Sequence, residues 1–131
     1  MFDPRPSLYL RLGGYDALAA FVDDLLSLAT SDPQIAVYLK GMSRDSRRRA
    51  RQLTLDFLCS SLGGPALYLG RDMKTLHEGM GISDDDWSVL MGHAGTALDD
   101  LGVAPREKND TLAFLEGLKG DIVEARDGQV L

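Results

Sequence analysis

The segment from position 70 to position 82 reads Gly70-Arg71-Asp72-Met73-Lys74-Thr75-Leu76-His77-Glu78-Gly79-Met80-Gly81-Ile82. It holds His77, one of only two histidines in the chain, at the end of a brief helical turn that glycines follow. A neutral imidazole is a common ligand of haem iron, and a ligand on a short helix can adjust its distance to the porphyrin plane. The alternative is a partly exposed surface histidine, which is the commoner state of a lone histidine.

The His77 segment belongs to an unusually long connection between two predicted helices. One predicted helix ends before Gly63-Gly64, and the next begins at Ser83. The residues between them contain only a short helical piece around positions 73–77. Helical bundles prefer short connections. We therefore expect this loop to wrap around something.

Helical periodicity dominates the rest of the chain. We predict long helices over about 15–30, 43–61, 83–101 and 105–125. Asp32 is placed to cap a further short helix that begins at Pro33, and Ser83 is placed to cap the helix that follows it. No segment shows the alternation of a strand, so the predicted fold class is all-α.

Each long predicted helix carries an apolar stripe with spacings of three and four residues, which is typical of a helix that faces a core. In chain order the four stripes contain Leu18, Phe21, Val22, Leu25 and Leu28; Ala50, Thr54, Phe57, Leu58 and Ser61; Trp87, Leu90, Met91, Ala94, Leu98 and Leu101; and Leu112, Leu115, Leu118 and Ile122.

The composition indicates one soluble globular domain over residues 1–131. Hydrophobic residues make up 44% of the chain and charged residues 26%, which is ordinary for that class. The formal net charge of −6 argues against nucleic-acid binding. No apolar run has the length of a membrane span, and the N-terminus lacks the apolar stretch of a signal peptide. We expect a cytoplasmic protein with no nucleic-acid or membrane partner.

The other chemically distinctive residues have ordinary structural explanations. Cys59 is the only cysteine, and its apolar neighbours predict a small buried side chain. His93 has no partner at a metal-binding spacing and is expected at the edge of the core or on the surface. Positions 47–51 hold four arginines, which predict a solvated helix face. A patch that docks a partner, or an additional contact to a cofactor carboxylate, is the alternative for this basic run.

Three motifs together resemble the group I truncated haemoglobins. They are Leu8-Tyr9-Leu10-Arg11-Leu12-Gly13-Gly14, Gly63-Gly64-Pro65-Ala66-Leu67-Tyr68 and the segment 70–82 quoted above. The resemblance covers about residues 7 to 124, and the paired glycines with the Met-Lys-x-x-His pattern are specific in combination. It implies a truncated globin-like two-over-two helical sandwich that holds haem b, with His77 as the proximal iron ligand.

The resemblance also implies which side chains line the haem. Those that match the proximal and inner walls are Met73, Leu76, Ile82, Trp87 and Met91. Those that lie where family members meet the haem propionates are Tyr68, Arg71 and Lys74, and cations beside carboxylates make physical sense there. Phe57 and Leu58, from the helix predicted over 43–61, belong to the expected haem-lining set.

The distal side departs from the family pattern. Members usually place a tyrosine where this chain has Leu26, and polar residues, often glutamine, where it has Ala50 and Thr54. Leu39 stands in place of the phenylalanine that packs on the haem face, with Tyr38 just before it. A hydrogen-bond donor stabilises bound O2 by about 1–3 kcal/mol. We therefore expect weak or fast-dissociating O2, and CO and NO that bind well, unless Tyr38 swings inward to supply a donor.

The resemblance thus predicts a haem globin that binds a diatomic gas (O2, CO or NO) at a His77-ligated iron. NO- or peroxide-linked redox activity at that iron is the alternative to simple ligand binding, with an unidentified reductase as its partner. The oligomeric state is expected to be a monomer or a weak homodimer. The alternative is a globin-fold interaction protein that has lost haem, which Leu39 in place of the stacking aromatic favours. His77 within its complete flanking motif argues against that alternative.

Overall fold

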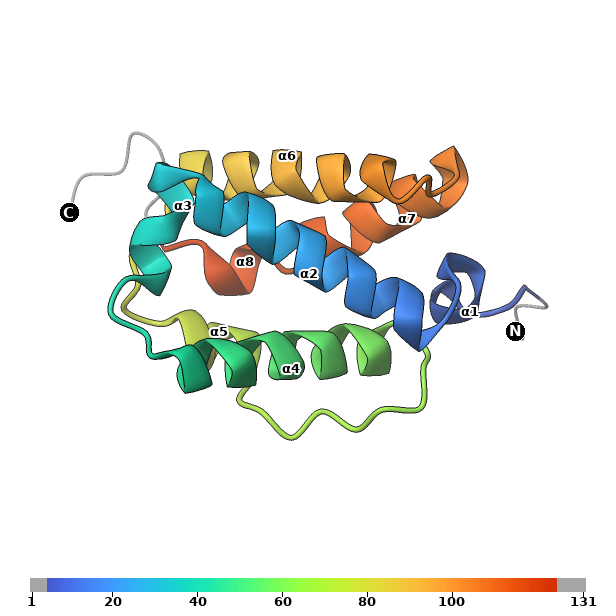
Figure 1. Ribbon diagram of the computed structural model, residues 1–131, viewed down its shortest axis with the longest axis horizontal. Helices are drawn as coiled ribbons and strands as arrows, with labels where there is room; N and C mark the ends of the chain where they lie inside the picture. The colour runs from blue at the N-terminus through green and yellow to red at the C-terminus, as the bar shows by residue number, and fades with distance from the viewer. Residues whose placement is uncertain (1–4, 125–131) are drawn as a thin grey trace.

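The computed structural model describes residues 5–124, and every regular element in that range is a helix (Figure 1). The all-α prediction is confirmed for this part of the chain. In chain order the elements are α1 (Leu8–Leu12), α2 (Tyr15–Ser31), α3 (Pro33–Ala36), η1 (Val37–Leu39, a 3-10 turn), α4 (Arg44–Ser61), α5 (Met73–His77), α6 (Asp84–Asp100), α7 (Pro105–Glu116) and α8 (Lys119–Ile122).

Local capping signals explain where several helices begin. The side chain of Asp32 accepts a hydrogen bond from the backbone N–H of Gln34 at the start of α3, as predicted. Ser83 and Asp86 form a reciprocal capping box at the start of α6. Ser43 caps α4 through the N–H of Ser46 at 3.0 Å. These bonds satisfy backbone donors that the first turn of a helix leaves free.

Helix α2 lies at the centre of the packing. It contacts α4 on one side and α6 on the other, and α6 also packs against α7 (Figure 1). The main core lies between these helices and includes Cys59, which is fully buried as predicted. Its other most deeply buried members are Leu18, Val22, Leu55, Ala97 and Leu98.

The predicted final helix is wrong in its extent. The structure breaks it into α7 and α8 at Gly117, whose N–H bonds back to the carbonyls of Ala113 and Phe114. A Cβ at position 117 would lie 3.2 Å from the Phe114 carbonyl oxygen, so the close turn suits glycine. The predicted end of this helix at Ala125 lies outside the described residues.

Two residues that were predicted to face the core are exposed instead. Leu101 is 42% exposed, because α6 has already ended at Asp100 and Leu101 only caps its last turn. Ser61 is exposed at the end of α4, where Leu62 is buried in its place. Both residues lie at the C-terminal end of their helix, where the periodicity of the sequence no longer gives the direction of the side chain.

The long connection between α4 and α6 begins with a close approach of backbone to side chain. A Cβ at Gly64 would lie 2.6 Å from both the Cys59 sulfur and the Tyr9 ring. Because glycine has no Cβ, the second glycine of the pair lets the loop leave α4 in close contact with Tyr9 of α1. Farther along, the ring of Tyr68 packs edge-on against Phe57, with centroids 5.3 Å apart. Between residues 5 and 124, no helix is long and apolar enough to cross a lipid bilayer.

Candidate functional site

His77 ends the five-residue helix α5, which matches the predicted helical piece at 73–77. Its Nδ1 lies 2.8 Å from the carbonyl oxygen of Met73, one turn earlier. A carbonyl only accepts, so Nδ1 carries the proton in this contact, which in a neutral imidazole leaves the lone pair on Nε2. A hydrogen bond of this kind fixes the tautomer and orientation of a metal-binding imidazole. His77 is only partly buried, so the hydrogen bond fixes its ring while part of the side chain stays exposed.

The loop that follows His77 is tied to the end of the described chain. The carboxylate of Glu124 accepts hydrogen bonds from the backbone N–H groups of Gly79 at 2.9 Å and Gly81 at 2.8 Å. The N–H of Glu124 in turn donates to the Ile82 carbonyl at 2.9 Å. These backbone hydrogen bonds hold the pKa of Glu124 below its usual value, so the carboxylate stays ionised. Gly79 and Gly81 both have positive φ, which lets their N–H groups converge on one side chain.

The residues expected on the proximal side gather into a second, smaller core. Trp87 is 3% exposed and packs with Ile122 and Val123 in this cluster. Its indole Nε1 donates to Glu116 at 3.0 Å, which joins α6 to the end of α7. Met73, Ile82 and Met91 pack around the same cluster, while Leu76 is 36% exposed beside His77.

A cavity of about 320 Å³ lies between α2, η1 and the first half of α4. Its lining includes all four residues expected on the distal side: Leu26, Leu39, Ala50 and Thr54. The remaining lining residues are Asp23, Ser27, Thr30, Met42, Arg47 and Arg51. Leu26, Leu39 and Ala50 carry no side-chain hydrogen-bond donor, Thr54 carries a hydroxyl, and Asp23, Arg47 and Arg51 are charged.

The two threonine hydroxyls of this cavity are already engaged. Thr54 Oγ1 donates to the Ala50 carbonyl at 2.8 Å, and Thr30 Oγ1 donates to the Leu26 carbonyl at 2.8 Å. Each bond lies within one helix, a usual arrangement for a threonine in a helix interior. Neither threonine offers its proton to a ligand in this arrangement.

Arg51 makes a two-pronged ion pair across the cavity from α4 to α2. Its Nε and Nη2 donate to the two carboxylate oxygens of Asp23 at 2.8 and 3.0 Å. The hydrogen bond from Arg51 lowers the pKa of Asp23, so the pair remains charged at neutral pH. The side chain of Arg47, one turn earlier on α4, makes its one hydrogen bond within residues 5–124 to the Leu39 carbonyl, at 3.4 Å.

Tyr38 does not supply a distal donor in this structure, contrary to the inward swing considered above. Its hydroxyl is hydrogen-bonded to the carboxylate of Asp86 at the start of α6. Partial burial together with this carboxylate raises the pKa of Tyr38 to about 12. The same carboxylate accepts from the Ser83 N–H at 3.2 Å, so one side chain anchors η1 and also closes the capping box of α6.

The remaining expected haem-lining residues are divided between the core and the surface. Phe57 is half-buried between Tyr68 and Phe114, while Leu58 is 4% exposed within the main core. Arg71 and Lys74 are exposed and make no ion pair with any residue between 5 and 124. They are therefore free to meet carboxylates from outside the chain.

A metal at His77 would need ligands that side chains do not supply. The described part of the chain contains no group of three or more His, Cys, Asp and Glu side chains able to hold an ion. The other histidine, His93, lies 2.7 Å from Asp32 and links α6 to the cap of α3. One held imidazole among apolar side chains fits a prosthetic group that brings its other metal ligands with it.

A model of the bacterial-like globin family matches residues 7–124. The chain belongs to the bacterial-like globins. The group 1 truncated hemoglobin GlbN of Mycolicibacterium paratuberculosis is 30% identical over 124 residues, which span 95% of this globin and 89% of that protein. The group 1 truncated hemoglobin LI410 of Chlamydomonas moewusii is 29% identical over 119 residues, spanning 89% and 68%. The predicted resemblance to the group I truncated haemoglobins is confirmed.

Solved structures show the same architecture. The truncated hemoglobin of Tetrahymena pyriformis in its Fe(III) form aligns with a TM-score of 0.82 at 25% identity, over 90% of this globin and 98% of that chain. The group II truncated hemoglobin of Bacillus anthracis aligns with a TM-score of 0.83 at 20% identity, over 98% and 100%, and so shares the fold. The predicted truncated-globin fold is confirmed, and family membership implies a haem-binding globin.

Several contacts of this globin's site had no signal in the sequence analysis. Asp23 belongs to no motif, and the sequence predicts Arg51 on a solvated helix face. Glu124 closes the loop after His77 from more than forty residues away. Side-chain partners so distant along the chain leave no local pattern, so only the folded structure pairs them.

Proposed function

We propose that this globin binds haem with His77 as the proximal ligand and receives diatomic ligands in the cavity beside Leu26. The observation that carries the proposal is the 2.8 Å contact between His77 Nδ1 and the Met73 carbonyl. That contact leaves Nε2 with its lone pair and holds the ring on a short helix. A bound haem supplies an iron centre able to take O2, CO or NO.

The residues around His77 fit such a group. Met73, Ile82 and Met91 offer apolar side chains that are only partly buried, so they have surface left to cover. Arg71 and Lys74 offer exposed cations without carboxylate partners in the described chain. An apolar wall with cations at its edge matches a flat apolar ring that carries carboxylates.

The distal residues support fast release of O2. Leu26, Leu39 and Ala50 carry no donor, and the Thr54 hydroxyl donates to its own helix. Tyr38 is held by Asp86. Ligands that depend little on a hydrogen bond, such as CO and NO, lose less binding affinity from the lack of a donor than O2 does.

The test is expression with haem supplied, followed by absorption spectra of the ferric, ferrous and CO-treated protein. We expect a Soret band that His77→Ala abolishes or shifts strongly, while His93→Ala, which alters the other histidine, leaves it in place. A Soret band unchanged in His77→Ala would overturn the proximal assignment.

A second candidate function rests on Leu39. It lines the cavity at the position where the family usually packs an aromatic ring on the haem, and an aliphatic side chain there offers less contact to a flat ring. This observation favours a globin-fold interaction protein without haem. A folded protein that stays colourless with haem supplied would support this function and overturn the first.

A further inference from the structure

We propose that the cavity between α2 and α4 selects small monovalent anions, of the size of azide or nitrite, through Arg47. In this proposal the carboxylate of Asp23 keeps the second cavity arginine, Arg51, from taking part. The inference rests on the proposed function, because it concerns ligands that reach the same distal side. It adds that, among the ligands of that site, those that carry a negative charge bind preferentially.

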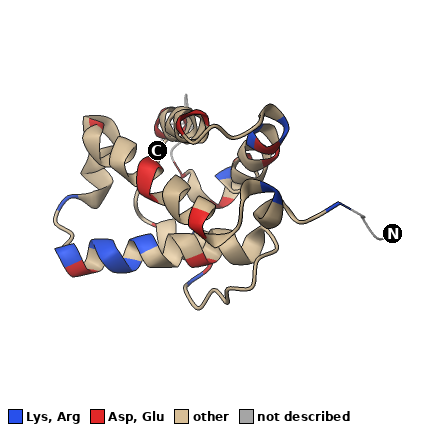
Figure 2. Ribbon diagram, turned by 45° about the vertical axis from the view of Figure 1, so that its right-hand side comes forward, with Lys and Arg blue, Asp and Glu red and all other residues tan. Residues whose placement is uncertain are grey.

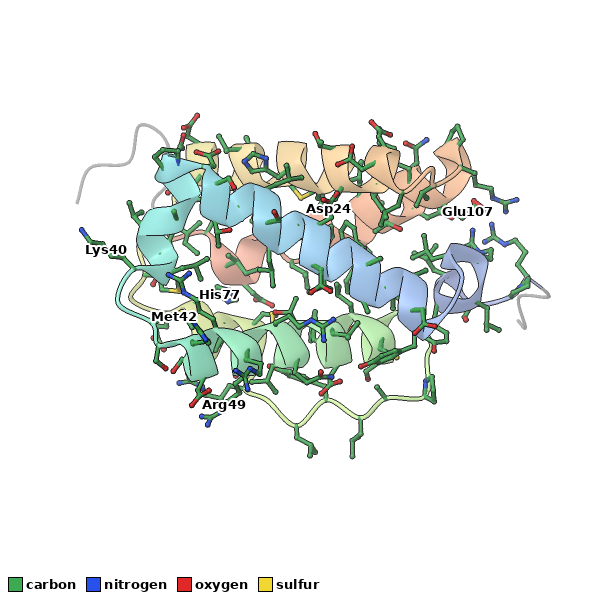
Figure 3. The ribbon with its side chains drawn as sticks, in the orientation of Figure 1. Asp24, Lys40, Met42, Arg49, His77 and Glu107 are labelled. Atoms are coloured by element: carbon green, nitrogen blue, oxygen red, sulfur yellow. The ribbon has the colours of Figure 1, made fainter. Side chains whose placement is uncertain are left out.

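The first support is the distribution of charge. The chain carries a net charge of −6, yet the first half of α4 is strongly basic (Figure 2). Figure 3 shows Arg49 pointing away from α2, at the outer edge of this helix. Arg44, Arg47, Arg48 and Arg49 are all exposed, and of these four only Arg47 lines the cavity. A local excess of positive charge beside a cavity raises the concentration of anions at its entrance.

The second support is the different state of the two arginines that do line the cavity. Arg51 is neutralised by Asp23 through two hydrogen bonds of 2.8 and 3.0 Å. Arg47 has no carboxylate partner within residues 5–124, and its one side-chain bond, to the Leu39 carbonyl, is long at 3.4 Å. The charged groups of the cavity therefore sum to one positive charge, carried by Arg47. One positive charge matches a monovalent anion.

The third support is the chemistry of the rest of the lining. Leu26, Leu39, Met42 and Ala50 are apolar, the hydroxyls of Thr30 and Thr54 donate to their own helix, and Ser27 adds one hydroxyl on an exposed residue. A neutral ligand gains little polar contact from these groups. An anion gains a charge-assisted hydrogen bond from Arg47, which is about twice as strong as a neutral one. The volume of about 320 Å³ leaves ample room for a ligand of a few atoms.

The test compares an anionic and a neutral ligand of the ferric, haem-loaded protein. Azide and imidazole are titrated separately at low ionic strength, and binding is followed by the shift of the Soret band. We expect Arg47→Gln to raise the Kd for azide about two- to fivefold, the effect of one charged contact made by an exposed side chain. The Kd for imidazole should not change.

Two further variants separate this effect from damage to the fold. Arg49→Gln removes an equal charge from the outer face of α4. At high salt, where steering by distant charges is screened, Arg49→Gln should leave the azide Kd unchanged while Arg47→Gln still raises it. Asp23→Asn releases Arg51 from its ion pair and should lower the azide Kd. A gain in affinity cannot result from misfolding.

The outcomes distinguish a failure of the anion site from a failure of the proposed haem-binding function. A normal Soret band and normal imidazole binding, with azide affinity that is insensitive to both Arg47→Gln and Asp23→Asn, would overturn the anion site alone. Absence of a Soret band would overturn the proposed function and this inference with it. A loss of azide and imidazole affinity together in Arg47→Gln would assign Arg47 a structural role and also refute the inference.

Discussion

Replacing Leu26 with tyrosine would place a phenolic hydroxyl on the wall of the distal cavity. Leu26 is only partly buried and borders about 320 Å³ of free space, so the larger ring has room. The nearest carboxylate on the lining, Asp23, is already held by Arg51 at 2.8 and 3.0 Å. It is therefore a poor competitor for the new hydroxyl, which remains available to a ligand.

The expected effect is a slower release of O2. A hydrogen bond to a charged or partly charged group contributes about 1.5–3 kcal/mol. Since each 1.4 kcal/mol is about a factor of ten, the O2 dissociation rate of Leu26→Tyr should fall by about 10- to 100-fold. The CO dissociation rate should change much less, because CO depends little on a donor.

The assay is stopped-flow displacement of O2 by CO from the ferrous protein. Leu26→Phe is the matched control, because it adds the same ring without the hydroxyl and should leave O2 release fast. Equal O2 dissociation rates in the tyrosine and phenylalanine variants would refute the reasoning. So would a slow rate in the unmodified protein that Tyr38→Phe makes fast, since Tyr38 would then be the donor.

Other parts of the structure give further predictions. Trp87→Phe removes the bond to Glu116 and part of a buried ring, and should lower the free energy of unfolding in urea by about 2 kcal/mol, whereas Glu116→Gln keeps an acceptor and should cost less. Tyr38, with its pKa raised from 10.0 to about 12, contributes stability that is complete below pH 10 and is lost as the pH rises through 12. An ultraviolet titration should show one late tyrosine, absent in Tyr38→Phe. The hydrogen bond with Asp100 raises the pKa of Asp24, which lies on the side of α2 facing α6 (Figure 3), so this pair stabilises the fold only in acid, below the raised pKa. Asp24→Asn should therefore raise the Tm at pH 7, and an unchanged or lower Tm would contradict this sign.

Local features of this chain are predictable from its sequence, whereas long-range contacts are not. The short helix α5, the Asp32 cap and the Ser83 cap were predicted at the positions where the structure has them. Each depends on residues within about one helical turn, so the signal is contained in a short window of sequence. The break at Gly117 was missed, because the apolar stripe continues through it into α8 and periodicity alone cannot show a close turn.

The sequence by itself determined the helical class, most helix starts and the motif that places His77 in a globin family. All of these depend on the spacing of residues that lie close together in the sequence. Only the tertiary structure decided the electrostatics of the site. It pairs Arg51 with Asp23, leaves Arg47 without a carboxylate partner in the described chain, and binds Tyr38 to Asp86. These partners come from different helices and from positions far apart along the chain. Their pairing depends on how α2, η1, α4 and α6 pack together, and that packing also determines the charge that the distal cavity presents to a ligand.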